Sequence, residues 1–290
     1  MTITWIALAW LLAAPLLALP WLARVPGARA APVSWRSVFA SMLWFVVAFD
    51  VVFLVQELFL VVPKALTPGL VATLFHNNHS WTGTDPRAAL FQGTGALATL
   101  VLGLACALAL RAPARRTGTR LLLGWIAYCG ALMALPQVVI GAQHEGNDVG
   151  MAFAYLGLAP PVKLALAVLV LLAIPPLAAW LARAFLALAP DARDARGRLR
   201  ALWRLVALPA LLAQPIVVAF RVPRDWQEVV LLPLIVVACG VPWMLAAGAA
   251  SPLPIGDRRP EPPSVAVPAV LALLLLAVFQ LVLRHGVTFG

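Results

Sequence analysis

Residues 37–62 read SVFASMLWFVVAFDVVFLVQELFLVV. This apolar run is longer than the roughly 20 residues that an α-helix needs to cross a bilayer. Its only acidic or basic side chains are those of Asp50 and Glu57. A run of this length and composition predicts a membrane-spanning helix.

The composition of the whole chain agrees with that prediction. Of its 290 residues, 63% are apolar and 11% are charged, and the mean hydropathy is +0.96. An ordinary globular domain is about 45–50% apolar and about 25% charged. These values exclude a soluble enzyme, a disordered protein and a nucleic-acid-binding domain. We therefore expect an all-α, polytopic integral membrane protein that has no nucleic-acid partner.

Eight apolar runs have the length of a membrane span. The predicted spans are residues 3–22, 37–62, 88–110, 121–141, 159–184, 201–220, 229–249 and 265–283. The connectors between them are too short to hold a separate soluble domain. Residues 1–290 are therefore expected to form a single transmembrane helical domain.

The basic residues predict the orientation. Fifteen of them lie in the connectors after the first, third, fifth and seventh spans, and five lie on the other side. Because cytoplasmic connectors carry an excess of Lys and Arg, both termini are expected on the exoplasmic side. This pattern is typical of a multi-pass protein of a bacterial-type inner (plasma) membrane, whose first partner is the lipid bilayer.

Three of the four histidines fall in two connectors on the exoplasmic side. His76 and His79 are three residues apart in one connector, and His144 lies in the other, followed by Asp148. Imidazole suits zinc, copper, iron and nickel, and a carboxylate often completes the ligand set. We therefore predict that His76, His79, His144 and Asp148 bind a divalent metal ion such as zinc. The alternative is a polar loop whose side chains cap helix ends and bind water.

The second span carries ionisable groups at a regular spacing. Asp50, Glu57 and Lys64 recur every seven residues, so they share one face of the helix. Buried carboxylates inside a membrane are costly and are functional candidates by default. Glu57 lies level with the histidine connectors, whereas Asp50 could instead form an interhelical pair, for example with Lys163.

The first functional hypothesis is a membrane-embedded, metal-dependent hydrolase that opens to the exoplasmic face. A metal-bound water has a lowered pKa, and Glu57 or Glu145 would take its proton as the catalytic base. The expected substrate is a lipid or a membrane-anchored peptide.

Three short patterns resemble those of the CPBP family of intramembrane proteases. Phe75 to His79 has the spacing of a Phe-x-x-x-His motif, and His144 to Asp148 has that of a His-x-x-x-Asn/Asp motif. Gln56-Glu57 stands in place of that family's Glu pair. The resemblance implies a protease whose site residues come from separate helices.

Two other functions remain open. In the first, the Asp50–Glu57–Lys64 face belongs to a proton- or cation-coupled transporter or to the membrane subunit of a larger complex. In the second, the chain is a scaffold whose external connectors bind a partner protein.

Overall fold

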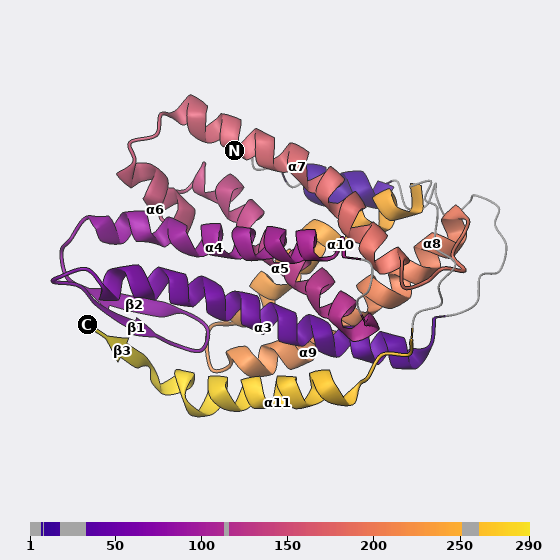
Figure 1. Cartoon of the computed structure of the whole chain (residues 1–290). Coiled ribbons are helices and arrows are strands. Elements are labelled where there is room, and N and C mark those ends of the chain that lie inside the picture. The colour runs from indigo at the N-terminus through magenta and orange to yellow at the C-terminus, as the bar shows by residue number, and fades with distance from the viewer. Residues whose placement is uncertain (1–6, 8, 18–32, 113–115, 251–260) are drawn as a thin grey trace.

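The computed structural model describes residues 7, 9–17, 33–112, 116–250 and 261–290 (Figure 1). The protein is predominantly helical, and within the described residues seven helices are long and apolar enough to cross a membrane. These helices coincide with the last seven predicted spans. Half of the first predicted span, 3–22, falls outside the described residues, and the part that is described contains the π-helix η1 (Ala9–Ala13).

Four of the seven helices are continuous, and three contain π- or 3₁₀-helical segments. The continuous ones are α3 (Trp35–Ala65), α4 (Arg87–Ala109), α5 (Thr117–Gly141) and α7 (Pro160–Leu186). The others are α8 (Ala195–Leu202) with η2 (Trp203–Ala207) and α9 (Leu208–Arg221); η3 (Gln227–Leu231) with α10 (Leu232–Ala250); and α11 (Ala266–Leu281), followed by η4 (Leu283–His285). A short helix, α6 (Asp148–Tyr155), joins α5 to α7.

A proline follows each of the described π-helical turns. The turns η1, η2 and η3 each end two residues before a proline, at Pro15, Pro209 and Pro233 respectively. Proline has no N–H to donate and its ring crowds the carbonyl four residues earlier. At these three prolines the preceding turn widens to the π form, whereas the prolines inside α3, α5 and α7 have no π turn before them.

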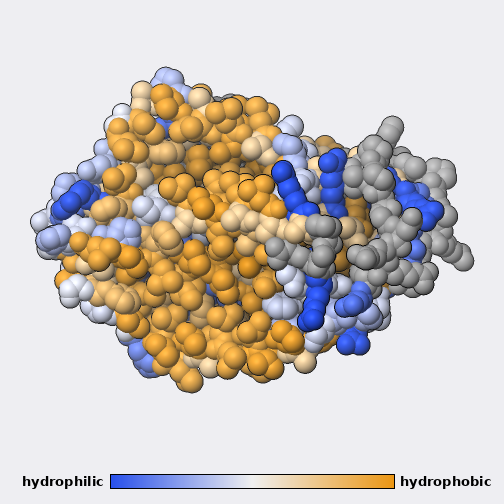
Figure 2. All heavy atoms as spheres, viewed as in Figure 1, coloured by the Kyte–Doolittle hydropathy of each residue, from blue (hydrophilic) through white to orange (hydrophobic). Residues whose placement is uncertain are grey.

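Helix α3 lies at the centre of the bundle and packs against α4, α5, α9 and α11 (Figure 1). Beside it, Trp125 of α5 meets Phe45 edge-on at 4.9 Å between ring centroids and also contacts Phe185 of α7. The most apolar stretches of α4, α7 and α11 are only 28%, 28% and 22% buried. Figure 2 shows hydrophobic side chains across the middle of the molecule, as a lipid-facing surface requires.

The prediction of an all-α protein was incomplete, because the second connector forms a β-hairpin. Strands β1 (Val71–Leu74) and β2 (His79–Thr82) pair antiparallel, and β3 (Val287–Phe289) adds to the other edge of β1, giving the order β2-β1-β3. Strands of three or four residues are too short to show a clear alternation of apolar and polar positions. The hydropathy pattern therefore gave no sign of the sheet.

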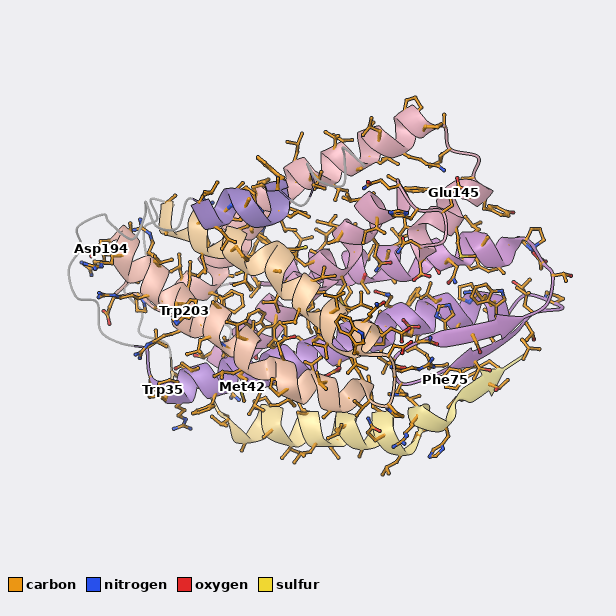
Figure 3. All side chains as sticks on the ribbon, turned by 180° about the vertical axis from the view of Figure 1, so that it is seen from behind. Trp35, Met42, Phe75, Glu145, Asp194 and Trp203 are labelled. Carbon is orange, nitrogen blue, oxygen red and sulfur yellow. The ribbon has the colours of Figure 1, made fainter. Side chains whose placement is uncertain are left out.

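The two ends of the bundle carry different polar residues. The hairpin, the C-terminal end of α3 and the α5–α6 connector lie at one end, which we call the hairpin end (Figure 1). In Figure 3, Phe75 and Glu145 mark this end, and Trp35 and Asp194 mark the opposite end, where α8 carries several arginines.

Candidate functional site

Helix α3 places three ionisable side chains inside the protein. Asp50, Glu57 and Lys64 are 0%, 5% and 0% exposed. Their spacing of seven residues keeps them on one helix face, as predicted, because seven residues are close to two helical turns. A row of buried ionisable groups therefore runs from the interior to the hairpin end.

The hairpin brings His79 and Trp81 onto this row. It begins after Gly69 and ends before Gly83, and both glycines have positive φ, at +82° and +112°. A Cβ on Gly83 would collide with the carbonyl oxygen of Gly69. Only glycine allows the two ends of the hairpin to meet this closely. Gly69 and Gly83 therefore let the chain enter and leave the hairpin at adjacent positions.

Glu57 and His79 form the centre of the site. Nδ1 of His79 lies 2.8 Å from Oε2 of Glu57, and Nε2 lies 3.0 Å from Oε1 of Gln92. Both side chains of the pair are almost wholly buried. Three segments that are distant in sequence, α3, β2 and α4, thus meet at one imidazole ring.

The bond from Lys64 to Gln92 indicates which atoms of His79 and Glu57 carry protons. Its Nζ donates to Oε1 of Gln92 at 3.1 Å, and an ammonium can only donate. The same Gln92 oxygen faces Nε2 of His79, so Nε2 carries a hydrogen. One further proton must then lie between His79 Nδ1 and Glu57, which share it as an ion pair or as a neutral pair.

Trp81 covers the site on the hairpin side. Its ring stacks on the His79 ring at 5.7 Å between centroids, with 17° between the planes. The Lys64 ammonium lies 4.7 Å from the centre of the Trp81 ring, on its face. This geometry is a cation–π contact, which strengthens when the cation is desolvated.

Asp148 adds a second carboxyl group to this cluster. It is the first residue of α6, and its charge interacts with those of Glu57, His79 and Lys64. Burial raises the pKa of the Asp148 carboxyl, and the negative charge of Glu57 raises it further. Helix α6 comes close because Gly93 of α4 leaves room for Ala152.

His76 occupies a different place from His79. It is 3% exposed, and its Nε2 lies 3.2 Å from the main-chain oxygen of Arg221, to which Asn77 also donates at 2.8 Å. Burial lowers the pKa of the His76 imidazole, and the charge of Arg224 lowers it further. The turn of the hairpin is thus anchored to the end of α9.

Arg221 itself points back into the bundle. Its guanidinium lies 4.3 Å from the centre of the Phe53 ring, and Phe53 is on α3 between Asp50 and Glu57. Nε donates to the main-chain oxygen of Glu228 at 3.0 Å, the one side-chain hydrogen bond that Arg221 donates within the described residues. Its charge interacts with Asp50, Glu57 and Glu228.

Asp50 is the most isolated of the buried acids. It is fully buried, and neither of its carboxylate oxygens has a hydrogen-bond partner in the described part of the chain. Lys163 is not its partner, because the Lys163 ammonium pairs with Glu145 at 2.9 Å. Arg221 is the cation whose charge acts on Asp50.

The structure therefore brings together Glu57, His79 and Asp148, and it separates them from the other predicted site residues. His76 lies against α9, whereas His144 and Glu145 are exposed on the α5–α6 connector. Among the described residues, no group of three or more His, Cys, Asp or Glu side chains is arranged to hold a metal ion. Both ring nitrogens of His79 already face protein groups.

Two residues of the site escaped the sequence analysis. Gln92 bonds to both Lys64 and His79, and Arg221 is 2% exposed. A polar side chain one turn inside an apolar span was the available signal for Gln92; Arg221, at the very end of a span, offered none.

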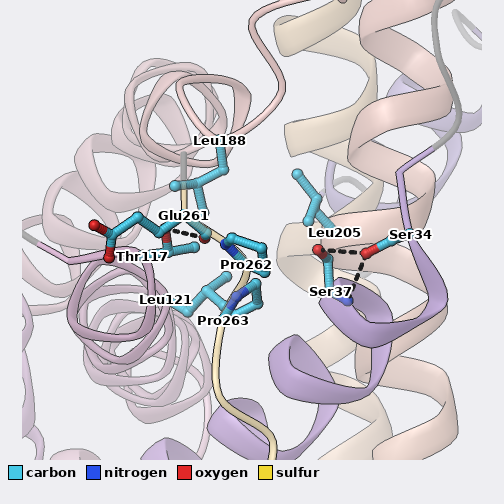
Figure 4. A pocket seen from close by; sticks show the side chains of 9 residues that line it. All are labelled: Ser34, Ser37, Thr117, Leu121, Leu188, Leu205, Glu261, Pro262 and Pro263. Atoms are coloured by element: carbon cyan, nitrogen blue, oxygen red, sulfur yellow. Dashed lines mark hydrogen bonds between the residues drawn. The ribbon is translucent and has the colours of Figure 1, made fainter. Parts of the chain in front are cut away.

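A pocket lies far from this site, at the opposite end of the bundle (Figure 4). It has a volume of about 160 Å³ and is lined by residues that include Ser34, Ser37, Thr117 and Glu261. Thr117 donates to the main-chain oxygen of Glu261 at 2.7 Å, and Ser34 caps α3. These hydroxyl groups thus serve the packing of helix ends.

The lowered pKa of His76 predicts a pH dependence of stability. The unfolded chain binds a proton at His76 at higher pH than the folded chain does, so the free energy of unfolding falls as the pH drops below about 6.5. His76→Gln keeps a donor for Arg221 but does not titrate. We expect thermal melts of the purified protein between pH 7 and 5 to show a smaller loss of Tm for His76→Gln than for the wild type. An equal loss would contradict this account.

No protein-family model, no curated protein and no solved structure matches this chain.

Proposed function

We propose that this protein is a membrane carrier that moves protons or small cations, with the Asp50–Glu57–Lys64 face of α3 as its working surface. The observation that carries the proposal is the buried Glu57–His79 pair, which shares one proton and is linked through Gln92 to the ammonium of Lys64. Buried ionisable groups in membrane helices mark ion and proton pathways.

The position of Asp50 supports the same function. It lies seven residues deeper than Glu57 on α3, about 10 Å along the helix axis, and it has a buried carboxyl group without a hydrogen-bond partner among the described residues. A group that accepts a proton or a cation during transport needs such unused acceptor atoms. The transported proton or cation would then bind first at Glu57 and next at Asp50, or in the reverse order.

The proposed setting is an inner (plasma) membrane of the bacterial type. The chain would span it eight times, with both termini and the hairpin end on the exoplasmic side, in keeping with the arginine-rich connectors at the other end. The Glu57–His79 pair would then face the exoplasmic medium beneath the hairpin.

Ion flux into liposomes tests the carrier. We expect purified protein in liposomes that contain a pH-sensitive dye to carry an inward proton flux when a negative-inside potential is applied. Asp50→Asn should reduce that flux to the level of protein-free liposomes, because an amide cannot exchange a proton. Glu57→Gln should do the same.

Asp85→Asn is the matched control for these variants. Asp85 is also a carboxylate at the hairpin end, but it pairs with Arg87 near the surface, so its removal should leave the flux unchanged. A flux that persists in Asp50→Asn, or none in the wild type with any cation, would refute the carrier.

A metal-dependent hydrolase is the second candidate, favoured by the meeting of Glu57, His79 and Asp148. For this function His79 and Asp148 would bind the metal and Glu57 would take a proton from water, after the Glu57–His79 bond opens. A zinc content of one per chain, lost in His79→Ala and Asp148→Ala, would support it over the carrier.

A further inference from the structure

The ammonium of Lys64 lies in surroundings that are made for a cation. Nζ donates to the main-chain oxygen of Leu60 at 2.6 Å and to Oε1 of Gln92 at 3.1 Å. The face of the Trp81 ring lies on a further side, 4.7 Å away. The negative charges of Glu57 and Asp148 act on the same ammonium.

Each of these groups accepts hydrogen bonds or attracts positive charge. Two carbonyl-type oxygens and an aromatic face match the N–H groups of a primary ammonium ion. The lysine is fully buried, so protein groups and not bulk water must solvate its charge. These groups thus have the chemistry of an ammonium-binding site, and the ammonium that occupies it is that of the Lys64 side chain.

Lys64, which occupies the site, has a flexible side chain, and Trp81, which forms one side of the site, belongs to the hairpin. Lys64 is one residue from the end of α3 and holds its ammonium on a flexible four-carbon stem. Trp81 belongs to the hairpin, which is joined to the bundle at Gly69 and Gly83. Movement of the hairpin away from the bundle would open the site, and it would break the bonds from His79 to Glu57 and Gln92.

We propose that the site formed by Leu60, Gln92 and Trp81 binds a small free cation of the primary-ammonium type, which exchanges with the side chain of Lys64. This inference rests on the proposed function in one respect, in that the exchanging cation would be the carrier's substrate. Lys64 then acts as a tethered competitor that occupies the site whenever the free cation is absent. A positive charge therefore always lies near Glu57 and Asp148.

Removal of the lysine ammonium tests the site directly. Lys64→Ala should have a lower Tm than the wild type, and methylammonium chloride should raise that Tm in a saturable way, because a ligand that binds only the folded state stabilises it. Tetramethylammonium chloride at the same ionic strength should not, since it has no N–H group to donate to Leu60 or Gln92. The wild type should respond to methylammonium more weakly than Lys64→Ala, because Lys64 competes for the site, and it should not respond to tetramethylammonium.

Lys163→Ala is the matched control. It also removes a buried lysine at the hairpin end, but the partner of that lysine, Glu145, is 69% exposed and needs no replacement cation. An equal response of the two lysine variants to methylammonium, or an equal effect of tetramethylammonium on Lys64→Ala, would overturn the proposal. So would a Lys64→Ala protein that stays unfolded both with and without methylammonium during purification.

The melting experiment is independent of transport. If Asp50→Asn keeps its flux, the carrier is lost but methylammonium binding to Lys64→Ala still stands. If methylammonium has no effect on Lys64→Ala while the flux depends on Asp50, the carrier stands and the ammonium site is lost.

Discussion

Gly130→Ala should lower the free energy of unfolding by about 2–3 kcal/mol, as expected for overpacking of a tight core contact. A Cβ on Gly130 of α5 would collide with the main-chain oxygen of Thr99 and lie 2.8 Å from Cα of Gly103, both on α4. Main-chain atoms inside a helix cannot move aside as a flexible side chain can. The two helices approach this closely because small residues face each other, so even one methyl group must push them apart.

Gly118→Ala is the control, because it makes the same change on the same helix. Its Cβ would lie 3.5 Å from Trp44, an ordinary van der Waals distance. Alanine is favoured over glycine in a helix by up to about 1 kcal/mol, so this variant should be as stable as the wild type or slightly more stable. Unfolding of both variants by denaturant in detergent micelles measures the difference. Equal stability of the two would show that α4 and α5 can separate freely.

The same substitution should affect the site at a distance. Gln92 lies on α4, and separation of α4 from α5 changes where α4 lies relative to α3. The bonds from Gln92 to Lys64 and His79 depend on that position. If the protein is the proposed carrier, Gly130→Ala should therefore weaken transport more than Gly118→Ala does.

The sequence predicted the helices well for a physical reason. A membrane helix satisfies its own main-chain hydrogen bonds, so an apolar run identifies it without knowledge of its neighbours. The shared face of Asp50, Glu57 and Lys64 was predictable for the same reason, because it depends only on the geometry of one helix.

The partners of these residues depend on how separate segments pack, which the sequence pattern does not contain. His144 and Asp148 are four residues apart, yet α6 directs Asp148 toward Glu57 and leaves His144 exposed. His76 and His79 separate because His76 lies in the tight turn of the hairpin, whereas His79 is the first residue of β2.

Gln92 shows a related limit. Its neighbours Gly93 and Gly95 predict close helix packing, and that prediction agrees with the approach of Gly95 to Leu60 and Gln56 of α3. Close packing is also what brings the Gln92 amide to Lys64. A packing motif and a side chain of the candidate site thus occupy the same turn, and the sequence alone indicated only the packing motif.

Arg221→Leu should be among the most destabilising substitutions in the chain, at about 3–5 kcal/mol, the usual cost of removing one partner from a buried group of charges. The variant loses the contact with Phe53 and the hydrogen bond to Glu228. It also leaves the Asp50 carboxyl group without the cation whose charge acts on it. Arg224→Leu, three residues further on, removes an exposed guanidinium and should change stability by no more than about 0.5 kcal/mol.

A double-mutant cycle separates the charge from the packing. If the Arg221 guanidinium serves Asp50 as its counter-charge, then Arg221→Leu should cost less in an Asp50→Asn background than in the wild type, because no carboxylate is left unpaired. The difference between the two costs is the coupling between the residues, typically about 0.5–3 kcal/mol for groups in one network. Equal costs in both backgrounds would mean that Arg221 acts through Phe53 and Glu228 alone. The Arg221 guanidinium would then not be the counter-charge of Asp50.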